Sequence, residues 1–254
     1  NTDVYARSSD TLTYTDNNVI KSVANYADAN TTLGTVNITS GKLSIYVDNV
    51  KKEITISDTD TFNALFGKIT SALGTGSQAG FLDAEGNITT DASKSTGKIG
   101  IKVADGKTII VGASNDTTNL ATIADFELTS AEQASGGRVL YKVNTSTKIT
   151  QAGLFRAGQV SEGTFKIGDA EFTITDDTTI ADVVSMINKS DKSYASAYWD
   201  SLSGTLVLEA ASTHSGSNLM NIEQGTSNFT TILGLTNDDG SLVTERQTLG
   251  QNAL

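Results

Sequence analysis

The sequence predicts an α+β protein made of two tandem ββαββ-type units, each an antiparallel sheet packed by one helix, on a small β-rich root. Two observations predict this fold. The chain contains an internal repeat, and each copy alternates apolar and polar residues before changing to helical spacing. The length agrees, because 254 residues suit one large domain or two ordinary domains of roughly 100 to 200 residues.

The repeat is clearest where a predicted strand runs into a predicted helix. Residues 54–69 read ITISDTDTFNALFGKI, residues 172–187 read FTITDDTTIADVVSMI, and the two segments align at a constant offset of 118. The core-type positions match in kind, and they are Ile54, Ile56, Phe62, Leu65, Phe66 and Ile69 in the first copy and Phe172, Ile174, Ile180, Val183, Val184 and Ile187 in the second. We therefore expect both copies to have one fold.

Each copy begins with a predicted hairpin. In the second copy, residues 164–167 and 171–175 alternate apolar and polar side chains across Gly168-Asp169, which is the pattern of two strands joined by a tight turn. The segments 31–35 and 148–153 lead into this hairpin in the two copies.

A helix follows the first hairpin. Ile180, Val183, Val184 and Ile187 recur at helical spacing, so one face of a helix of about ten residues is apolar. We expect this face to pack on the hairpin.

A second hairpin is predicted after each helix. It spans residues 98–103 and 108–112 in the first copy, and residues 194–199 and 205–209 in the second. The first copy is larger, because residues 74–96 add a stretch rich in Gly, Ser, Thr and Asp that we expect to be a loop.

The copies end on short apolar segments, residues 123–128 and 232–235, and a strand predicted over residues 138–144 closes the first. The predicted organisation is a root formed by residues 1–29 and 237–254, a first domain of residues 30–150 and a second domain of residues 151–236.

Missing residue types exclude several classes of function. The chain has no Cys, no Pro and a single His, His214. It can therefore form no disulfide, zinc-thiolate site or iron–sulfur cluster, and a Ser-His-Asp triad could use only His214. That residue lies among small residues without a G-x-S-x-G elbow, which favours an exposed loop position. We expect no catalytic residue, no cofactor and no metal.

The charge balance bears on partners. The formal net charge is −11 and the sequence pI is about 4.5, which is the wrong sign for neutralising phosphates. No stretch approaches the roughly 18 to 20 apolar residues of a membrane span. We expect neither nucleic acid nor membrane as a partner, and we expect a soluble piece of a longer chain, since Asn1 is no natural initiator.

The densest carboxylates are the pairs Asp58/Asp60 and Asp176/Asp177. Neither stretch has the spacing of a calcium-binding EF-hand loop. Both pairs come just before a predicted helix, so we interpret them as helix caps. By similar reasoning Asp238-Asp239-Gly240 is predicted to be a turn.

Tyr194, Tyr198 and Trp199 are candidates for a sugar-stacking or partner-binding surface. In an alternating strand, Tyr198 and Trp199 point to opposite faces. We expect one of them to anchor the core and the other to be exposed.

Part of the second copy resembles a known motif. Residues 163–174, 178–188 and 203–208 are similar to the flagellin hook IN motif of bacterial flagellar axial proteins, notably the filament cap family (hook-associated protein 2). Residues 229–236 and 250–253 resemble the exit from this motif in that family, where a strand of the root domain resumes.

The resemblance implies a structural, non-enzymatic role outside the cell, at the distal tip of the bacterial flagellum. Cap proteins form a ring of subunits whose outer domains make a plate, beneath which exported flagellin folds and inserts. The implied partners are further copies of the chain, flagellin and other hook-associated proteins. Because this sequence contains no heptad helices, it would be the outer, head-forming region only.

Two alternatives remain open at this stage. The chain could be the surface-exposed variable region of a flagellin or of a hook–filament junction protein. It could instead be an adhesin that binds host glycans or mucin, for which Tyr198, Trp199 and the hydroxyl-rich loops are the only indications.

Overall fold

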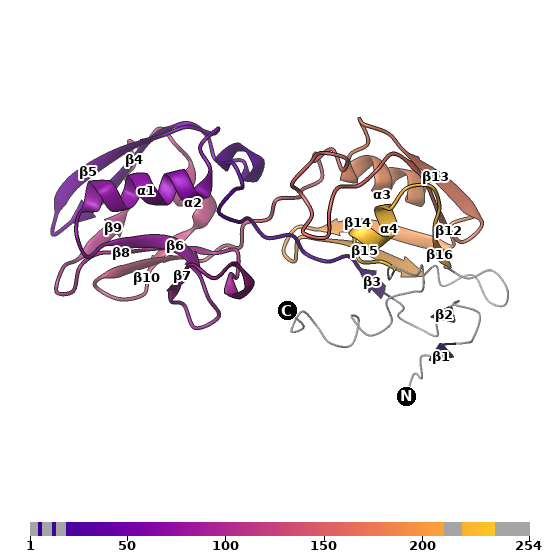
Figure 1. The fold of residues 1–254 in the computed structure, drawn as a ribbon, viewed down its shortest axis with the longest axis horizontal. Helices are drawn as coiled ribbons and strands as arrows, with labels where there is room; N and C mark the ends of the chain where they lie inside the picture. Colours follow the sequence, from indigo (N-terminus) through magenta and orange to yellow (C-terminus); the bar gives the residue numbers. More distant parts are fainter. Residues whose placement is uncertain (1–4, 7–11, 14–18, 211–219, 237–254) are drawn as a thin grey trace. The chain divides into compact units, whose positions relative to one another are not determined.

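The computed structural model describes residues 5–6, 12–13, 19–210 and 220–236. In this part of the chain, the protein is α+β, with small antiparallel sheets and few helices (Figure 1). The predicted fold class is therefore confirmed at this level. The predicted root segment 237–254 lies outside the described residues.

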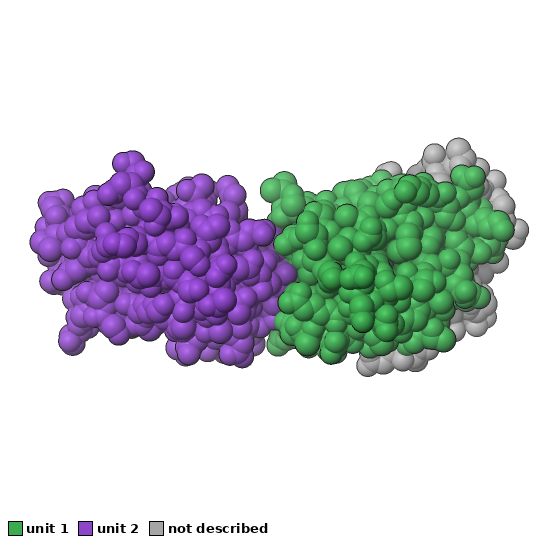
Figure 2. Space-filling model, turned by 90° about the horizontal axis from the view of Figure 1, so that it is seen from above, with its two compact units in different colours: residues 1–25, 143–254 green, residues 26–142 purple. Residues whose placement is uncertain are grey.

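The chain divides into two compact units (Figure 2). Unit 1 comprises residues 1–25 and 143–254, and unit 2 comprises residues 26–142. Unit 2 overlaps the predicted domain of residues 30–150, and it begins and ends before the predicted limits of that domain.

Unit 2 contains two sheets and one long helix. Its first sheet has the order β5-β4-β9, with β4 at Gly41–Val47, β5 at Val50–Ile56 and β9 at Ile109–Val111. Its second sheet has the order β10-β11-β8-β6-β7, with β6 at Gln78–Leu82, β7 at Ile88–Thr89, β8 at Ile99–Lys102, β10 at Phe126–Leu128 and β11 at Gln133–Gly136. Helix α1, Phe62–Leu73, contacts β5 and β6 and so bridges the two sheets (Figure 1). The shorter elements are helix α2 at Leu120–Ala124 and 3-10 turns at Leu33–Val36 and Ala92–Lys94.

Unit 1 has a similar set of elements. One sheet has the order β13-β12-β16, with β12 at Gly163–Ile167, β13 at Ala170–Ile174 and β16 at Ile222–Gln224. The other has the order β14-β15-β3, with β3 at Val19–Lys21, β14 at Ala195–Asp200 and β15 at Thr205–Ala210. The helices are α3 at Ile180–Asn188 and α4 at Phe229–Ile232, and a separate pair of short strands is formed by β1 at Tyr5–Ala6 and β2 at Leu12–Thr13.

Each unit encloses its own hydrophobic core, and each long helix lines that core with the predicted face. The buried helix residues are Phe62, Leu65 and Ile69 in α1 and Ile180, Val183 and Ile187 in α3. Phe66 and Val184 pack against the same cores while remaining partly exposed. The prediction of both amphipathic helices is confirmed. Burial of such a face provides most of the stability of a short helix.

The predicted second hairpin is present in unit 1 and wrong in unit 2. Strands β14 and β15 pair as expected, from Ala195↔Ala210 to Asp200↔Thr205. In unit 2, β8 and β9 belong to different sheets, because β8 pairs with β6 and β11 while β9 pairs with β4. Alternation identified both strands correctly, but it carries no information on which distant strand supplies the hydrogen bonds.

Two further predictions for unit 2 are wrong. The stretch expected to be a loop, residues 74–96, contains β6 and β7. Gly80 in this stretch serves close packing within the sheet, since a Cβ there would lie 2.8 Å from Ile88 Cγ2. The strand expected over residues 138–144 is not formed, and only Tyr141 makes an isolated bridge there.

The same turn precedes the first hairpin in both units. In unit 2, Asp28 Oδ1 accepts from the N–H two residues further on at 3.0 Å, and the Asp28 N–H donates to Thr31 Oγ1 at 3.0 Å. In unit 1, Asn144 Oδ1 accepts from the N–H two residues further on at 2.9 Å, and the Asn144 N–H donates to Thr147 Oγ1 at 2.9 Å. Such turns are typical of Asp and Asn.

The two units also share a side-chain connection at their last helix. In unit 2, Asn119 precedes α2, accepts from the Thr39 N–H at 2.8 Å and donates to the carbonyl two residues before Thr39 at 2.9 Å. In unit 1, Asn228 precedes α4, accepts from the Ser161 N–H at 2.7 Å and donates to the carbonyl two residues before Ser161 at 3.0 Å. One asparagine thus fastens the last helix of each unit to the segment before its first hairpin. We call Asn119 and Asn228, with these bonds, the asparagine clamps.

Candidate functional site

The structure places the two predicted surface residues on opposite faces of β14. Trp199 is paired with Leu206, is partly buried and packs against the core of unit 1. Tyr198 is 44% exposed and lies opposite Val207, whose other neighbour across the sheet is Lys21 on β3. Tyr198 is therefore the residue available to a partner, whereas Trp199 contributes to the fold.

The Tyr198 hydroxyl is held by a carboxylate. It donates to Glu209 Oε1 at 3.2 Å. Desolvation and, after it, the negative charge of Glu209 raise the pKa of Tyr198, so the hydroxyl is protonated at neutral pH. The ring thus presents an apolar body and a neutral hydroxyl, a combination frequent at binding surfaces.

Tyr194 does not join Tyr198 on this surface. Its backbone has a positive φ of 52°, and its hydroxyl donates to Asp169 Oδ2 at 2.7 Å. Asp169 belongs to the β12–β13 turn, where a Cβ on Gly168 would lie 2.7 Å from Tyr194 Cδ2. Tyr194 therefore ties the start of β14 to the first hairpin, which is a structural role.

The helix caps are threonines, so the predicted capping by the aspartate pairs is wrong. The Ala64 N–H donates to Thr61 Oγ1 at 3.2 Å at the start of α1. At the start of α3, the Asp182 N–H donates to Thr179 Oγ1 at 3.2 Å and the Thr179 N–H donates back to Asp182 Oδ2 at 2.9 Å. This reciprocal pair is a capping box, shifted along the chain from the residues we expected.

The aspartates bind other groups nearby. Asp60 accepts from the Ser57 N–H at 2.7 Å and from Lys68 Nζ at 2.5 Å, while Asp177 forms an ion pair of 2.6 Å with Lys148. The hydrogen bonds from Lys68 and Lys148 lower the pKa of Asp60 and of Asp177 respectively. Both carboxylates are therefore ionised at neutral pH, and neither has the raised pKa of a general acid.

Unit 1 has an opening that the sequence did not reveal. A shallow polar cavity of about 320 Å³ in unit 1 is lined by Thr150, Gln159, Val160, Ser161, Glu162 and Asp176. Its polar groups bind one another: Gln159 Nε2 donates to the Thr150 carbonyl at 2.7 Å, and the Asp176 N–H donates to Glu162 Oε1 at 3.0 Å. Because these lining groups are hydrogen-bonded to one another, we interpret the cavity as a surface recess.

The matching connection in unit 2 is shorter and packs closely. There the Gly34 N–H donates directly to the Asp58 carbonyl at 2.7 Å, and a Cβ on Gly34 would lie 3.2 Å from that oxygen. The longer connection between Ile149 and Val160 is the sequence signal that could have located the recess.

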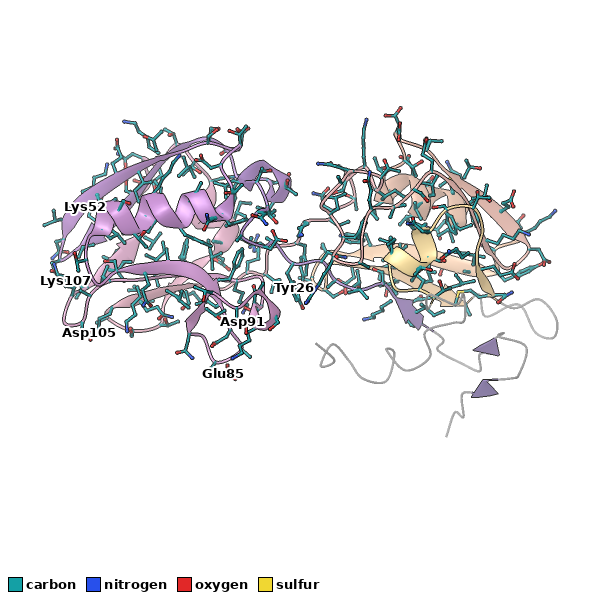
Figure 3. The ribbon with its side chains drawn as sticks, in the orientation of Figure 1. Tyr26, Lys52, Glu85, Asp91, Asp105 and Lys107 are labelled. Carbon is teal, nitrogen blue, oxygen red and sulfur yellow. The ribbon has the colours of Figure 1, made fainter. Side chains whose placement is uncertain are left out.

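One end of unit 2 carries charged loops. Lys107 lies 3.9 Å from Asp48 and Lys102 lies 3.7 Å from Asp105, and Figure 3 shows Lys107 and Asp105 at the end of this unit away from Tyr26. Such exposed ion pairs contribute little to stability.

Neither a metal-ligand cluster nor a membrane-spanning helix is found among the described residues. No group of three or more His, Cys, Asp or Glu side chains in that part of the chain is placed to hold a metal ion. None of the helices described above has the length and apolar character needed to cross a membrane. His214 and the predicted turn at residues 238–240 lie outside the described residues.

The features described above define a class: an α+β protein of two units that share their first hairpin, long helix, entry turn and asparagine clamp. No protein-family model, curated protein or solved structure matches the chain.

Proposed function

We propose that this chain is the outer, head-forming region of a bacterial flagellar filament cap protein. In this role it is structural and non-enzymatic, lies outside the cell at the filament tip, self-associates within a cap ring, and promotes folding and insertion of exported flagellin. The resemblance of residues 163–174, 178–188 and 203–208 to the flagellin hook IN motif supports the proposal.

The finer part of the proposal is that both units are copies of one ββαββ-type unit. The observation that carries it is the shared hydrogen-bond framework: Asp28 and Asn144 make the same entry turn, and Asn119 and Asn228 make the same clamp. The two clamp bonds join segments 80 and 67 residues apart in the sequence, so chance similarity of short local elements does not account for them. On this proposal, the motif that unit 1 resembles extends to unit 2.

Localisation tests the proposal directly. Antibodies raised against the full chain, used on a flagellated bacterium that encodes it, should label only the distal filament tip in electron micrographs. Label along the whole filament would favour a flagellin variable region, and label at the hook–filament junction would favour a junction protein. Label confined to the cell body would overturn the flagellar assignment.

Deletion provides a second measurement of the same proposal. Removing the encoding gene should abolish filaments and release unassembled flagellin into the medium, and the intact gene should restore filaments. Normal filaments in the deletion strain would contradict a cap function.

The glycan-binding alternative has its own test. If the outer face of β14 binds glycans, Tyr198→Ala should abolish binding on a glycan array while Leu202→Ala, at a side chain that is 90% exposed on the same hairpin, should not. Trp199→Ala is unsuited to this purpose, because Trp199 packs against the core and its loss would disturb the fold.

A further inference from the structure

The two chain ends of unit 2 are joined to each other. The Ala27 N–H donates to the Leu140 carbonyl at 2.8 Å. Tyr26 and Tyr141 form an isolated antiparallel bridge, and their rings lie 5.7 Å apart between centroids at an interplanar angle of 33°. The incoming and outgoing segments thus form a short clasp, in which Figure 3 labels Tyr26.

An ion pair completes the clasp. Lys142 Nζ lies 2.6 Å from Asp28 Oδ2, and only 11% of the Lys142 side chain is exposed, against 43% for Asp28. The other oxygen of Asp28 accepts from the Asn30 N–H at 3.0 Å, the Thr31 N–H at 3.0 Å and the Thr31 hydroxyl at 2.9 Å. One carboxylate therefore connects the outgoing segment to the turn that follows the incoming segment.

This turn holds the start of helix α1. The Phe62 N–H donates to the Thr31 carbonyl at 3.0 Å, and the Asn63 N–H donates to the Ala29 carbonyl at 2.9 Å. The first amides of a helix have no partner inside the helix, so these two carbonyls supply what the helix itself cannot. The clasp and the first turn of α1 are linked through Asp28.

Unit 1 shows that the charge of Asp28 is not needed for the turn or for the cap. Asn144, which is uncharged, makes the same turn there. The carbonyl of Thr147 accepts from the Ile180 N–H at 3.2 Å, as Thr31 does for α1. The feature that distinguishes Asp28 is its negative charge, and the group that uses this charge is Lys142.

We propose that the Asp28–Lys142 pair is a latch that holds the two chain ends of unit 2 together and keeps helix α1 capped, and that this latch opens before the core of unit 2 unfolds. When it opens, the segments 26–28 and 140–142 separate, the turn at residues 28–31 loosens, and the first turn of α1 loses its partners. The sheets of unit 2 remain intact, because their strands pair with one another and not with the clasp.

Amide hydrogen exchange on the full chain tests the latch, since local opening is seen residue by residue below the global unfolding free energy. Asp28→Asn gives unit 2 the residue that unit 1 has, so the turn can still form, but it is no longer held by the ion pair to Lys142 and opens more often. We expect about tenfold faster exchange at Ala27, Phe62 and Asn63, the size expected for a charged, half-buried hydrogen bond. The amides of β4 should be unchanged.

Two further variants make the test decisive. Lys142→Met removes the charge and keeps an apolar stem, and it should accelerate exchange at the same amides. Asn144→Asp is the reverse substitution in unit 1, and it should leave amide exchange at Ala27, Phe62 and Asn63 unchanged. Unchanged exchange at these amides in both Asp28→Asn and Lys142→Met would overturn the proposal. Equal acceleration in β4 would also overturn it, because this would show global destabilisation in place of a latch.

Discussion

The two units cover the open edge of their second sheet by different means. In unit 2, strand β7 pairs with β6 at Phe81↔Thr89 and Leu82↔Ile88. In unit 1, β14 has no such neighbour among the described strands, and a side chain takes the place of a strand. Asn188, the last residue of α3, accepts from the Ala197 N–H at 2.7 Å and donates to the Ala197 carbonyl at 2.8 Å.

A second difference concerns the third strand of that sheet. Beside β15 lies β3, which precedes β15 in the sequence, whereas beside β8 lies β11, which follows β8. Similar sheets are therefore completed from opposite directions of the chain. The first hairpin, the long helix and the clamp are therefore constant between the units, while the sheet edges and the connections vary.

The largest expected effect concerns the glycines where the clamp meets the first hairpin. A Cβ on Gly41 would lie 2.5 Å from the Thr118 nitrogen, and a Cβ on Gly163 would lie 2.6 Å from the Ser227 nitrogen. Because backbone atoms cannot move aside, Gly41→Ala and Gly163→Ala should each destabilise its own unit by about 3 kcal/mol. Calorimetry of the full chain should show one unit melting earlier in each variant.

Gly67→Ala is the matched control. Gly67 lies inside α1, and a Cβ there would meet no atom within 4 Å. This change should stabilise unit 2 by about 0.5 to 1 kcal/mol, since alanine favours the helix. An unchanged melting temperature in Gly163→Ala would show that the two clamps are not equivalent.

The next effect distinguishes the two helix starts. Thr179→Ala should destabilise unit 1 by about 1 to 2 kcal/mol, because it removes one half of a capping box. Thr61→Ala should cost about 1 kcal/mol in unit 2, where only the single bond from Ala64 is lost. Urea unfolding of the full chain, followed separately for each unit, measures both changes.

Asp177→Asn tests whether the threonine or, as the sequence predicted, the aspartate caps helix α3. Asp177 is exposed and pairs with Lys148, so we expect no measurable change in the stability of unit 1. A loss as large as that in Thr179→Ala would restore the aspartate as the cap.

The parts of the fold that depend on residues close together in the chain could be predicted from the sequence. The helix faces of α1 and α3 and the hairpins β4–β5 and β12–β13 follow from periodicity and short turns, and all are present. The pairing of β9 with β4 depends on residues that are far apart in the chain, so local alternation assigned β9 to the wrong hairpin.

The candidate sites follow the same rule. The opposite orientations of Tyr198 and Trp199 come from the twofold period of a strand. The Asp28–Lys142 pair, the asparagine clamps and the recess near Thr150 each join distant segments. Within the helix starts, Thr and Asp offer similar oxygens, and the backbone geometry selected the threonines.

A smaller effect is expected at the edge of β14. Asn188→Ala removes two hydrogen bonds to Ala197 and should destabilise unit 1. The loss should be only about 1 kcal/mol, because water can replace these bonds at a partly exposed edge. The same change frees the edge of β14 for pairing with another chain, so sedimentation should detect more self-association than in the wild type. Asn63→Ala, at an exposed position of α1, serves as the control, and equal self-association in both variants would show that Asn188 does not protect the edge.

The smallest effect is the acid sensitivity that Asp28 gives to unit 2. Burial raises the pKa of Asp28, but the hydrogen bond and charge of Lys142, together with the hydrogen bonds from Thr31 and Asn30, outweigh burial and hold this pKa below its ordinary value of 3.8. Since the unfolded chain then binds the proton more readily, the contribution is present above pH 3.8 and is lost as the pH falls through the folded-state pKa. Asp28→Asn removes this pH-dependent contribution to stability, so the melting temperature of unit 2 should fall less steeply with falling pH than in the wild type. Unit 1 has Asn144 at the matching position, so its own acid response should not change in this variant. Parallel curves for unit 2 in the wild type and Asp28→Asn would mean that the charge on Asp28 does not stabilise the folded unit.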